Sequence, residues 1–192
     1  TQQLLDKLAI KAPKLVEDLV PGKLPLGTVT KVLQNLLDES VVIRDMKTIV
    51  ETLSDECAKT QDAEQLTNLV RPKLGRMIVQ NLVDTEETLE VMTLDPELEQ
   101  LLHNVLQQNQ GNQEVILEPG LAEGLFKSLR ESTQEVEDQG KPAVLVVSPP
   151  IRSWLSRAAK HRISELTVLS YSEIPDDQSV KVIQTIELNE KN

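Results

Sequence analysis

The side chains suited to covalent chemistry are few, and they stand apart in the sequence. His103 follows Glu99 by four residues, which brings both side chains to one face of a helix and would suit a proton relay. No nucleophile or orienting group accompanies this pair, so we interpret His103 as a partly exposed structural histidine. Cys57 has neither a neighbouring cation nor a second cysteine to favour its thiolate. The spacing therefore predicts no catalytic pair.

The known catalytic motifs lead to the same expectation. The sequence contains no nucleophile elbow, no HExxH zinc motif, no phosphate-binding glycine loop and no GxGxxG dinucleotide motif. One cysteine, with only His103 and His161 beside it, cannot build the usual zinc clusters. A hydrolase stays open as an alternative only through Ser148, at the end of an expected strand, with His161 downstream. We expect no enzyme activity, no cofactor and no metal site.

The composition excludes further classes of function. The 192 residues carry 31 acidic and 20 basic side chains, a net charge of -11, with one Phe, one Trp and one Tyr. Nucleic-acid binding needs basic side chains for the phosphates and rings for the bases, so we expect no nucleic-acid partner. The longest apolar run, residues 143–147, is far shorter than the roughly 20 residues of a membrane helix. The single cysteine fits a reducing compartment.

The charge divides the chain into two parts. Residues 1–80 hold 11 basic and 11 acidic side chains, whereas residues 81–192 hold 9 basic and 20 acidic ones and so carry the whole net charge. The three aromatic residues also lie in the second part. This shift predicts two units, 1–80 and 81–192. The acidic faces at 84–99 and 131–138 would steer basic partners or keep the protein soluble.

The first unit is expected to be entirely helical, because apolar residues recur at steps of three and four. Pro21-Gly22 interrupts the pattern, Asp45 can cap a helix, and Pro72 is expected to bend or split the last one. A short extended run covers residues 41–43. The chain begins with Thr inside the first helix and shows no signal peptide, so we expect a fragment of a longer protein. The expected helices cover residues 2–10, 13–19, 26–38, 45–58 and 62–82.

The second unit alternates strands and helices. A continuous apolar run at 143–147 predicts a central strand covered on both faces. Asp95-Pro96 joins a capping carboxylate to a proline at the first helical position, and so begins a helix. The predicted fold class is α+β: an all-helical subdomain followed by a compact α/β sandwich subdomain. The other expected elements are strands at 89–94, 166–170 and 180–188, the last at an edge, helices at 119–140 and 149–162 with Ser148 as a cap, and a loop at 107–113.

One surface feature suggests a binding site. The expected helix 151–162 gathers four basic side chains around the only tryptophan of an otherwise acidic unit. Trp and Arg are favoured at the centres of interfaces, so this helix is a candidate surface for an acidic partner segment or a neighbouring copy of the protein. The alternative is that the basic end complements the helix dipole while the tryptophan packs on the sheet. The candidate partner-binding residues are Arg152, Trp154, Arg157, Lys160 and Arg162.

Several separated motifs occur in the order of one known family. LVEDLVP at 15–21, VLQNLLDE at 32–39 and VIRD at 42–45 stand in the first unit. EPGL at 118–121, the run AVLVV before Ser148, and VLSYSEIP at 168–175 stand in the second. Together they resemble the cytoplasmic region of the FlhA family (FHIPEP) of export gate proteins, which serve flagellar and virulence type III secretion. The turn SYSEIP is more similar to the flagellar branch.

The resemblance implies a multipass inner-membrane protein whose cytoplasmic region has four subdomains and forms a nine-membered ring below the export channel. The chain is similar to the helical third and α/β fourth subdomains, preceded by the end of a first-subdomain helix, at the cytoplasmic face of the membrane. The family's ring receives export substrates with their chaperones and contacts the ATPase complex and its stalk subunit. Its chaperone-docking depression lies in the first two subdomains, so no docking residue can be carried over.

Two alternatives stand beside this interpretation. An export gate of the virulence (injectisome) branch would share most of the motifs. A winged-helix regulatory protein would use residues 41–43 as its wing, but the first unit is net neutral and shows no basic recognition helix. We therefore expect a protein-binding module of the flagellar export gate.

Overall fold

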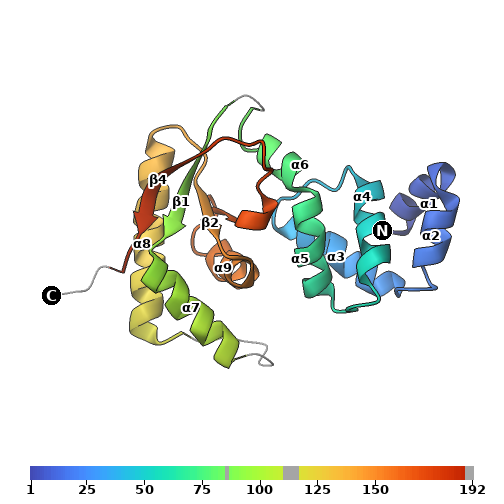
Figure 1. The fold of residues 1–192 in the computed structure, drawn as a ribbon, viewed down its shortest axis with the longest axis horizontal. Helices are drawn as coiled ribbons and strands as arrows, with labels where there is room; N and C mark the ends of the chain where they lie inside the picture. Colours follow the sequence, from blue (N-terminus) through green and yellow to red (C-terminus); the bar gives the residue numbers. More distant parts are fainter. Residues whose placement is uncertain (85–86, 110–116, 189–192) are drawn as a thin grey trace. The chain divides into compact units, whose positions relative to one another are not determined.

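The computed structural model describes residues 1–84, 87–109 and 117–188, and the chain forms two compact subdomains (Figure 1). The first contains residues 1–81 and also the short segment Glu173–Pro175, and the second contains the rest. The shift in charge predicts Glu173–Pro175 in the second unit. The structure instead groups this segment with the helices, so the chain passes between the subdomains three times.

The first subdomain is built from short helices packed around an aliphatic core. Buried leucines, valines and isoleucines occur at helical spacing, as the periodicity predicts. Among them, Leu19, Val32, Leu36, Ile49 and Leu66 are inaccessible to solvent. The helices are α1 (Gln2–Lys11), α2 (Pro13–Leu19), α3 (Leu26–Asp38), α4 (Met46–Glu56), α5 (Ala63–Lys73) and α6 (Gly75–Gln80).

Aspartate caps fix the starts of two of these helices. The Asp45 carboxylate accepts a hydrogen bond from the backbone N–H of Thr48 at 3.0 Å, and Asp62 accepts one from that of Gln65 at 2.9 Å. Such caps satisfy amides that have no partner inside the helix. The run at 41–43 forms no strand, and no strand lies within residues 1–84. The wing required by the winged-helix alternative is therefore missing from the described first subdomain.

The long helix expected at 62–82 is two helices, α5 and α6. Pro72 stands in the last turn of α5, and Leu74 separates the two helices. Gly75, the first residue of α6, lies so close to the backbone carbonyl of Glu173 that an added Cβ would overlap it. The break therefore allows the backbone of α6 to approach a segment almost 100 residues further along the chain.

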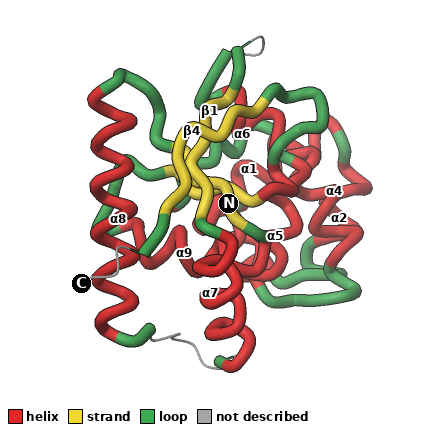
Figure 2. The backbone as a smooth tube through the Cα atoms, turned by 60° about the vertical axis from the view of Figure 1, so that its left-hand side comes forward, coloured by secondary structure: helices red, strands yellow, loops and turns green. Residues whose placement is uncertain are grey.

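The second subdomain is a parallel four-stranded sheet with three helices. The strands lie side by side in the order β3-β2-β1-β4, and Figure 2 shows β1 beside β4. All four residues of β2 are buried, and β4 stands at the edge, as predicted. The elements are β1 (Leu89–Leu94), α7 (Pro96–Gln108), α8 (Pro119–Asp138), β2 (Val144–Val147), α9 (Pro149–Lys160), β3 (Thr167–Ser170), a single helical turn (Tyr171–Glu173) and β4 (Val180–Ile186).

One core joins these elements. Met92, Leu145 and Val168 from three neighbouring strands pack in one cluster with residues of α7, α8 and α9. Met92 and Leu94, like Leu145 and Val147, alternate along their strands, so the helices cover one face of the sheet. A helical subdomain followed by an α/β subdomain confirms the predicted fold class. The expected loop 107–113 is helical at its start, and its residues 110–113 lie outside the described part.

Candidate functional site

Helix α9 carries the residues proposed from the sequence as partner contacts, but the structure separates them. Arg152 is only 2% exposed, so its side chain is not offered to a partner. Trp154 is half-buried and packs against the core of the second subdomain, as the alternative interpretation has it. Arg157 and Lys160 are exposed in the last turn of α9, where cations complement the helix dipole. The five residues therefore do not form one continuous surface.

Arg162 lies just beyond α9 and meets an aromatic ring of α8. Its guanidinium carbon is 4.5 Å from the centre of the Phe126 ring, a cation–π geometry, and its Nη1 donates to the carbonyl of Ala158 at 3.4 Å. This contact forms the wall of an open groove of about 650 Å³. We call it the Phe126 groove, and it is lined by Pro119, Ala122, Glu123, Phe126, Lys127, Arg130, Glu131 and Arg162.

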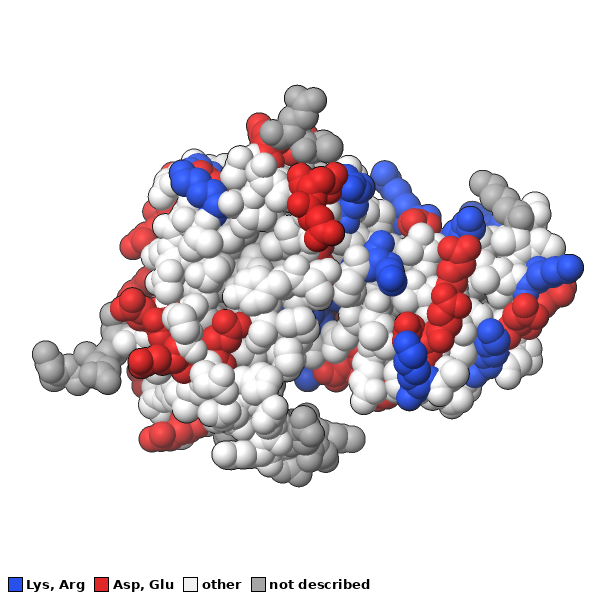
Figure 3. Space-filling view, in the orientation of Figure 1, with Lys and Arg blue, Asp and Glu red and all other residues white. Residues whose placement is uncertain are grey.

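An acidic surface continues along the same helix. In Figure 3, acidic side chains gather over the part of the second subdomain that carries α8 and β4. A hollow beside β4 is lined by Glu131, Glu135 and Glu187, and Gln184 donates a hydrogen bond to Ser132 at 2.9 Å across it. The acidic face predicted at 131–138 begins next to the cations of the Phe126 groove, since Glu131 lines both the groove and the hollow.

At the carboxyl end of β2, on the edge where α/β sheets usually bind ligands, a side chain of the protein itself binds the backbone. Glu99 of α7 accepts a hydrogen bond at 2.6 Å from the backbone N–H of Ser148, at the start of α9. The Ser148 side chain makes no capping bond, contrary to expectation. Burial, and after it the charge and hydrogen bond of Glu99, raise the pKa of Tyr171. Glu99 thus takes the place that an anionic ligand would occupy.

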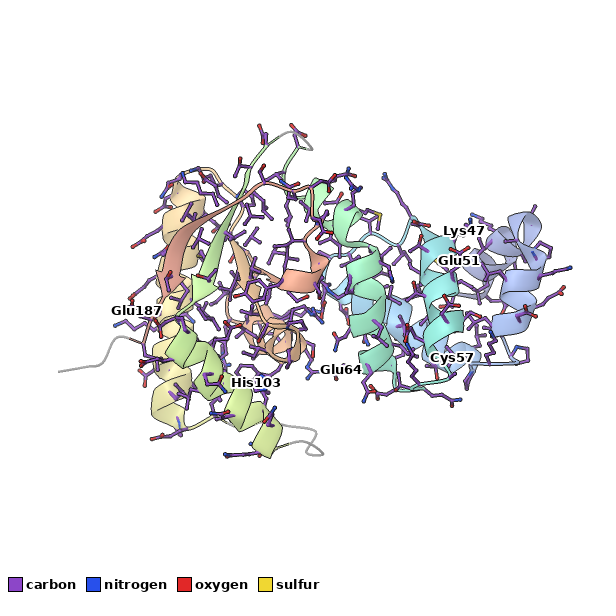
Figure 4. The ribbon with its side chains drawn as sticks, viewed as in Figure 1. Lys47, Glu51, Cys57, Glu64, His103 and Glu187 are labelled. Atoms are coloured by element: carbon purple, nitrogen blue, oxygen red, sulfur yellow. The ribbon has the colours of Figure 1, made fainter. Side chains whose placement is uncertain are left out.

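The catalytic pairs considered from the sequence do not assemble. Ser148 precedes α9 and His161 follows it, so the 12-residue helix separates them by about 18 Å. The His103 ring nitrogen lies 2.7 Å from the amide of Gln107, while Glu99 is engaged with Ser148. Cys57 is buried, and its thiol donates to the carbonyl of Ser54 (Figure 4). The hydrolase alternative therefore has no geometric support.

The first subdomain holds a buried ion cluster that sequence analysis missed. Arg71 donates from Nε and Nη2 to the two carboxylate oxygens of Glu173, at 3.0 and 2.8 Å, and from Nη1 to Glu39 at 2.6 Å. Burial alone would lower the pKa of Arg71, but Glu173 and Glu39 outweigh that effect and raise it. One signal in the sequence was the position of Arg71, which follows Thr67 by four residues and therefore lies on the same face of α5. In the structure this face is buried.

Two kinds of site are missing from the described residues. No group of three or more His, Cys, Asp and Glu side chains among them could hold a metal ion. Likewise, no helix in residues 1–84, 87–109 and 117–188 has the length and apolar character needed to cross a membrane.

The fold is that of the cytosolic domains of type III secretion proteins. The nonameric EscV cytosolic domain from the type III secretion system matches with a TM-score of 0.78 at 24% identity, over 97% of this chain and 55% of that chain. Nonameric EPEC SctV-C matches with a TM-score of 0.83 at 25% identity, over 96% of this chain and 55% of that chain. A chain of the Chlamydia pneumoniae CdsV and CdsO protein complex matches with a TM-score of 0.87 at 25% identity, over 97% of this chain and 54% of that chain.

The chain belongs to the FHIPEP family, whose model matches residues 1–179. It is 44% identical over 185 residues to flagellar biosynthesis protein FlhA of Escherichia coli (strain K12), covering 96% of this chain and 26% of that protein. Flagellar biosynthesis protein FlhA of Bacillus subtilis (strain 168) is 32% identical over 188 residues, which cover 98% of this chain and 28% of that protein. The chain thus spans about a quarter of the length of these relatives. The predicted family is confirmed, and the flagellar branch is favoured over the virulence branch.

Proposed function

We propose that this chain is part of the cytosolic platform of a flagellar type III protein export gate, and that it works by binding proteins during flagellum assembly. The observation that supports this best is the 44% identity to a flagellar FlhA over 96% of the chain. The surfaces described above are charged and open, and Glu99 occupies the usual ligand position of the sheet. The proposal involves no catalysis, and it places the chain at the cytoplasmic face of the inner membrane.

The proposed partners follow from the family. They are further copies of the longer protein in a ring, export chaperone–substrate complexes, and the ATPase complex with its stalk subunit. Structural neighbours named as nonameric, or as a complex of CdsV with CdsO, support a ring and a bound partner in this class of protein. On α9, exposed Arg157 and Lys160, together with Arg162, remain the proposed contacts, whereas buried Arg152 and half-buried Trp154 do not.

A segment exchange tests the flagellar assignment. The corresponding segment of Escherichia coli FlhA is replaced by this chain, and motility in soft agar is measured in a strain that lacks its own FlhA. We expect motility to return at least in part, because the two proteins are 44% identical over 185 residues, and cores tolerate many apolar substitutions that keep volume and pattern. The matched control is the same exchange carrying Arg71→Leu, which is expected to stay non-motile. A non-motile strain in which the unmutated exchange protein accumulates normally contradicts the proposal.

A binding measurement tests the partners separately. The isolated chain is titrated by calorimetry with export chaperones, with their substrate complexes and with the ATPase stalk subunit. We expect the stalk subunit to bind, because the family implies that contact for the second subdomain, and the chaperones to bind only to longer proteins. An absence of heat with every partner would rule out partner binding by this part of the protein.

A further inference from the structure

The Phe126 groove concentrates positive charge on an acidic subdomain. Residues 81–192 carry 9 basic and 20 acidic side chains, yet Lys127, Arg130 and Arg162 all line this one groove. Two carboxylates, Glu123 and Glu131, also line it, so the lining has a net charge of about +1 within a subdomain near -11. An acidic ligand would thus meet attraction here and repulsion over most of the remaining surface of the subdomain.

The cations of the groove are available to a ligand to different degrees. The Nζ of Lys127 lies 3.9 Å from the carboxylate of Glu131. Because both side chains are well exposed, this ion pair is weak and leaves Lys127 available to a ligand. Arg130 is exposed and makes no ion pair with any residue that the structure describes. Arg162 covers the face of Phe126 and donates from Nη1 to Ala158, and such stacking leaves the other edge of the guanidinium able to bind a carboxylate. Arg130 and Arg162 are therefore the principal sites for a carboxylate.

The floor of the groove is apolar and follows one stripe of α8. Ala122, Phe126 and Arg130 recur every four residues, and Pro119 stands at the start of the helix. This stripe can take an apolar side chain placed between carboxylates that reach the two arginines. A nucleic acid does not fit, because the single ring is already covered by Arg162 and the subdomain as a whole repels phosphates.

From this arrangement we propose that the Phe126 groove binds a short acidic segment of a partner protein, in which aspartate or glutamate alternates with an apolar residue. Carboxylates pair with Arg130 and Arg162, and the apolar side chain packs over Ala122 and Pro119. The inference rests on the groove alone. A failure of the motility test above would leave it standing, since its readout is direct binding to the chain.

Fluorescence polarisation with the complete 192-residue chain tests the proposal. The probe is a short labelled peptide that alternates aspartate with leucine, and the matched probe has asparagine in place of each aspartate. We expect only the acidic peptide to bind, with weaker binding as salt rises, because exposed charges are screened. Equal binding of both peptides overturns the proposal. Displacement by inorganic phosphate at the peptide's own concentration does so too, because it reveals an anion site without peptide preference.

Charge-neutralising variants locate the contact. We expect Arg130→Gln to weaken binding of the acidic peptide about fivefold to tenfold, the effect of one charge-assisted contact. Arg130→Gln with Arg162→Gln should abolish it at the same peptide concentrations. Lys181→Gln is the matched control, since it removes an equal charge from β4, outside the groove, and should change binding less than twofold. An equal loss in the control, or no loss in Arg130→Gln with a native circular dichroism spectrum, overturns the proposal.

Discussion

The guanidinium of Arg71 donates two hydrogen bonds to the carboxylate of Glu173, although 102 positions separate the residues in the sequence. Both side chains are only 2% exposed. Glu173 belongs to a three-residue segment that returns to the helical subdomain from the α/β part of the chain. The pair therefore ties this segment into the helices, and the bond to Glu39 completes the buried cluster.

Removing one member of this cluster should cost much of the stability. We expect Arg71→Leu to lower the free energy of unfolding by about 3–5 kcal/mol, because the buried Glu173 carboxylate would lose the guanidinium that neutralises its charge. Urea denaturation measures the change. Lys47→Leu is the matched control, because it breaks the exposed pair with Glu51 (Figure 4) and should cost under about 1 kcal/mol. A similar small loss in both variants would mean that the Arg71 cluster contributes little.

Replacing both members together should be far milder. In Arg71→Met with Glu173→Leu, the most buried carboxylate is removed together with the guanidinium, only the partly exposed Glu39 keeps its charge, and apolar side chains of similar size can fill the space. We expect this double variant to be more stable than Arg71→Leu alone, by thermal denaturation at neutral pH. If the double variant is less stable than the single one, the ion pair contributes more than the cost of burying its charges.

The close approach of α6 to Glu173 makes a second, sterically based prediction. Gly75→Ala places a methyl group against the Glu173 carbonyl, so we expect a loss of about 1–3 kcal/mol, the usual cost of overpacking. Gly27→Ala in α3 is the control, because nothing lies within 4 Å of the added carbon there. Its expected change is a gain of up to about 1 kcal/mol, since alanine favours helix. Equal effects in urea denaturation would contradict the proposed overlap.

The cap of α4 predicts a loss of stability in acid. Hydrogen bonds from the side chain and backbone of Thr48 lower the pKa of Asp45 below 3.8. Because the folded-state pKa is the lower one, the stabilisation is present above pH 3.8 and is lost as the pH falls through the folded value. Asp45→Asn keeps a capping oxygen but does not titrate, so its stability should depend less on pH below 4. Identical acid profiles for both proteins would exclude this role.

The raised pKa of Tyr171 predicts a loss of stability at alkaline pH. Its pKa is raised above 10.0 by burial and then by Glu99, so its contribution is complete below pH 10.0 and is lost as the pH rises through the folded value. Tyr171 is the chain's one tyrosine, so tyrosinate absorbance reports it directly. We expect Glu99→Gln to shift that titration toward lower pH. His103→Gln, on the same helix, should leave it in place, and a shift of equal size there would contradict the assignment to Glu99.

The sequence alone determined the local structure and the family. Asp45 and Asp95 stand before apolar stripes of helical spacing, and each begins a helix as a capping carboxylate should. The continuous run at 143–147 predicted the central strand, because a strand of a parallel sheet that is buried on both faces is apolar throughout. Both signals act between neighbours in the chain, which is why a pattern of residue types suffices to find them.

Only the tertiary structure decided which of the charged residues are exposed and which are buried. In sequence, Arg152 and Arg162 look alike, yet one is buried and the other covers Phe126 at an open groove. Arg71 and Glu173 also look like ordinary surface charges. Their pairing depends on a chain return across 102 positions and on the space left by Gly75. The local pattern of residue types cannot predict this ion pair, because the energy of a buried charge depends on which group the fold places beside it.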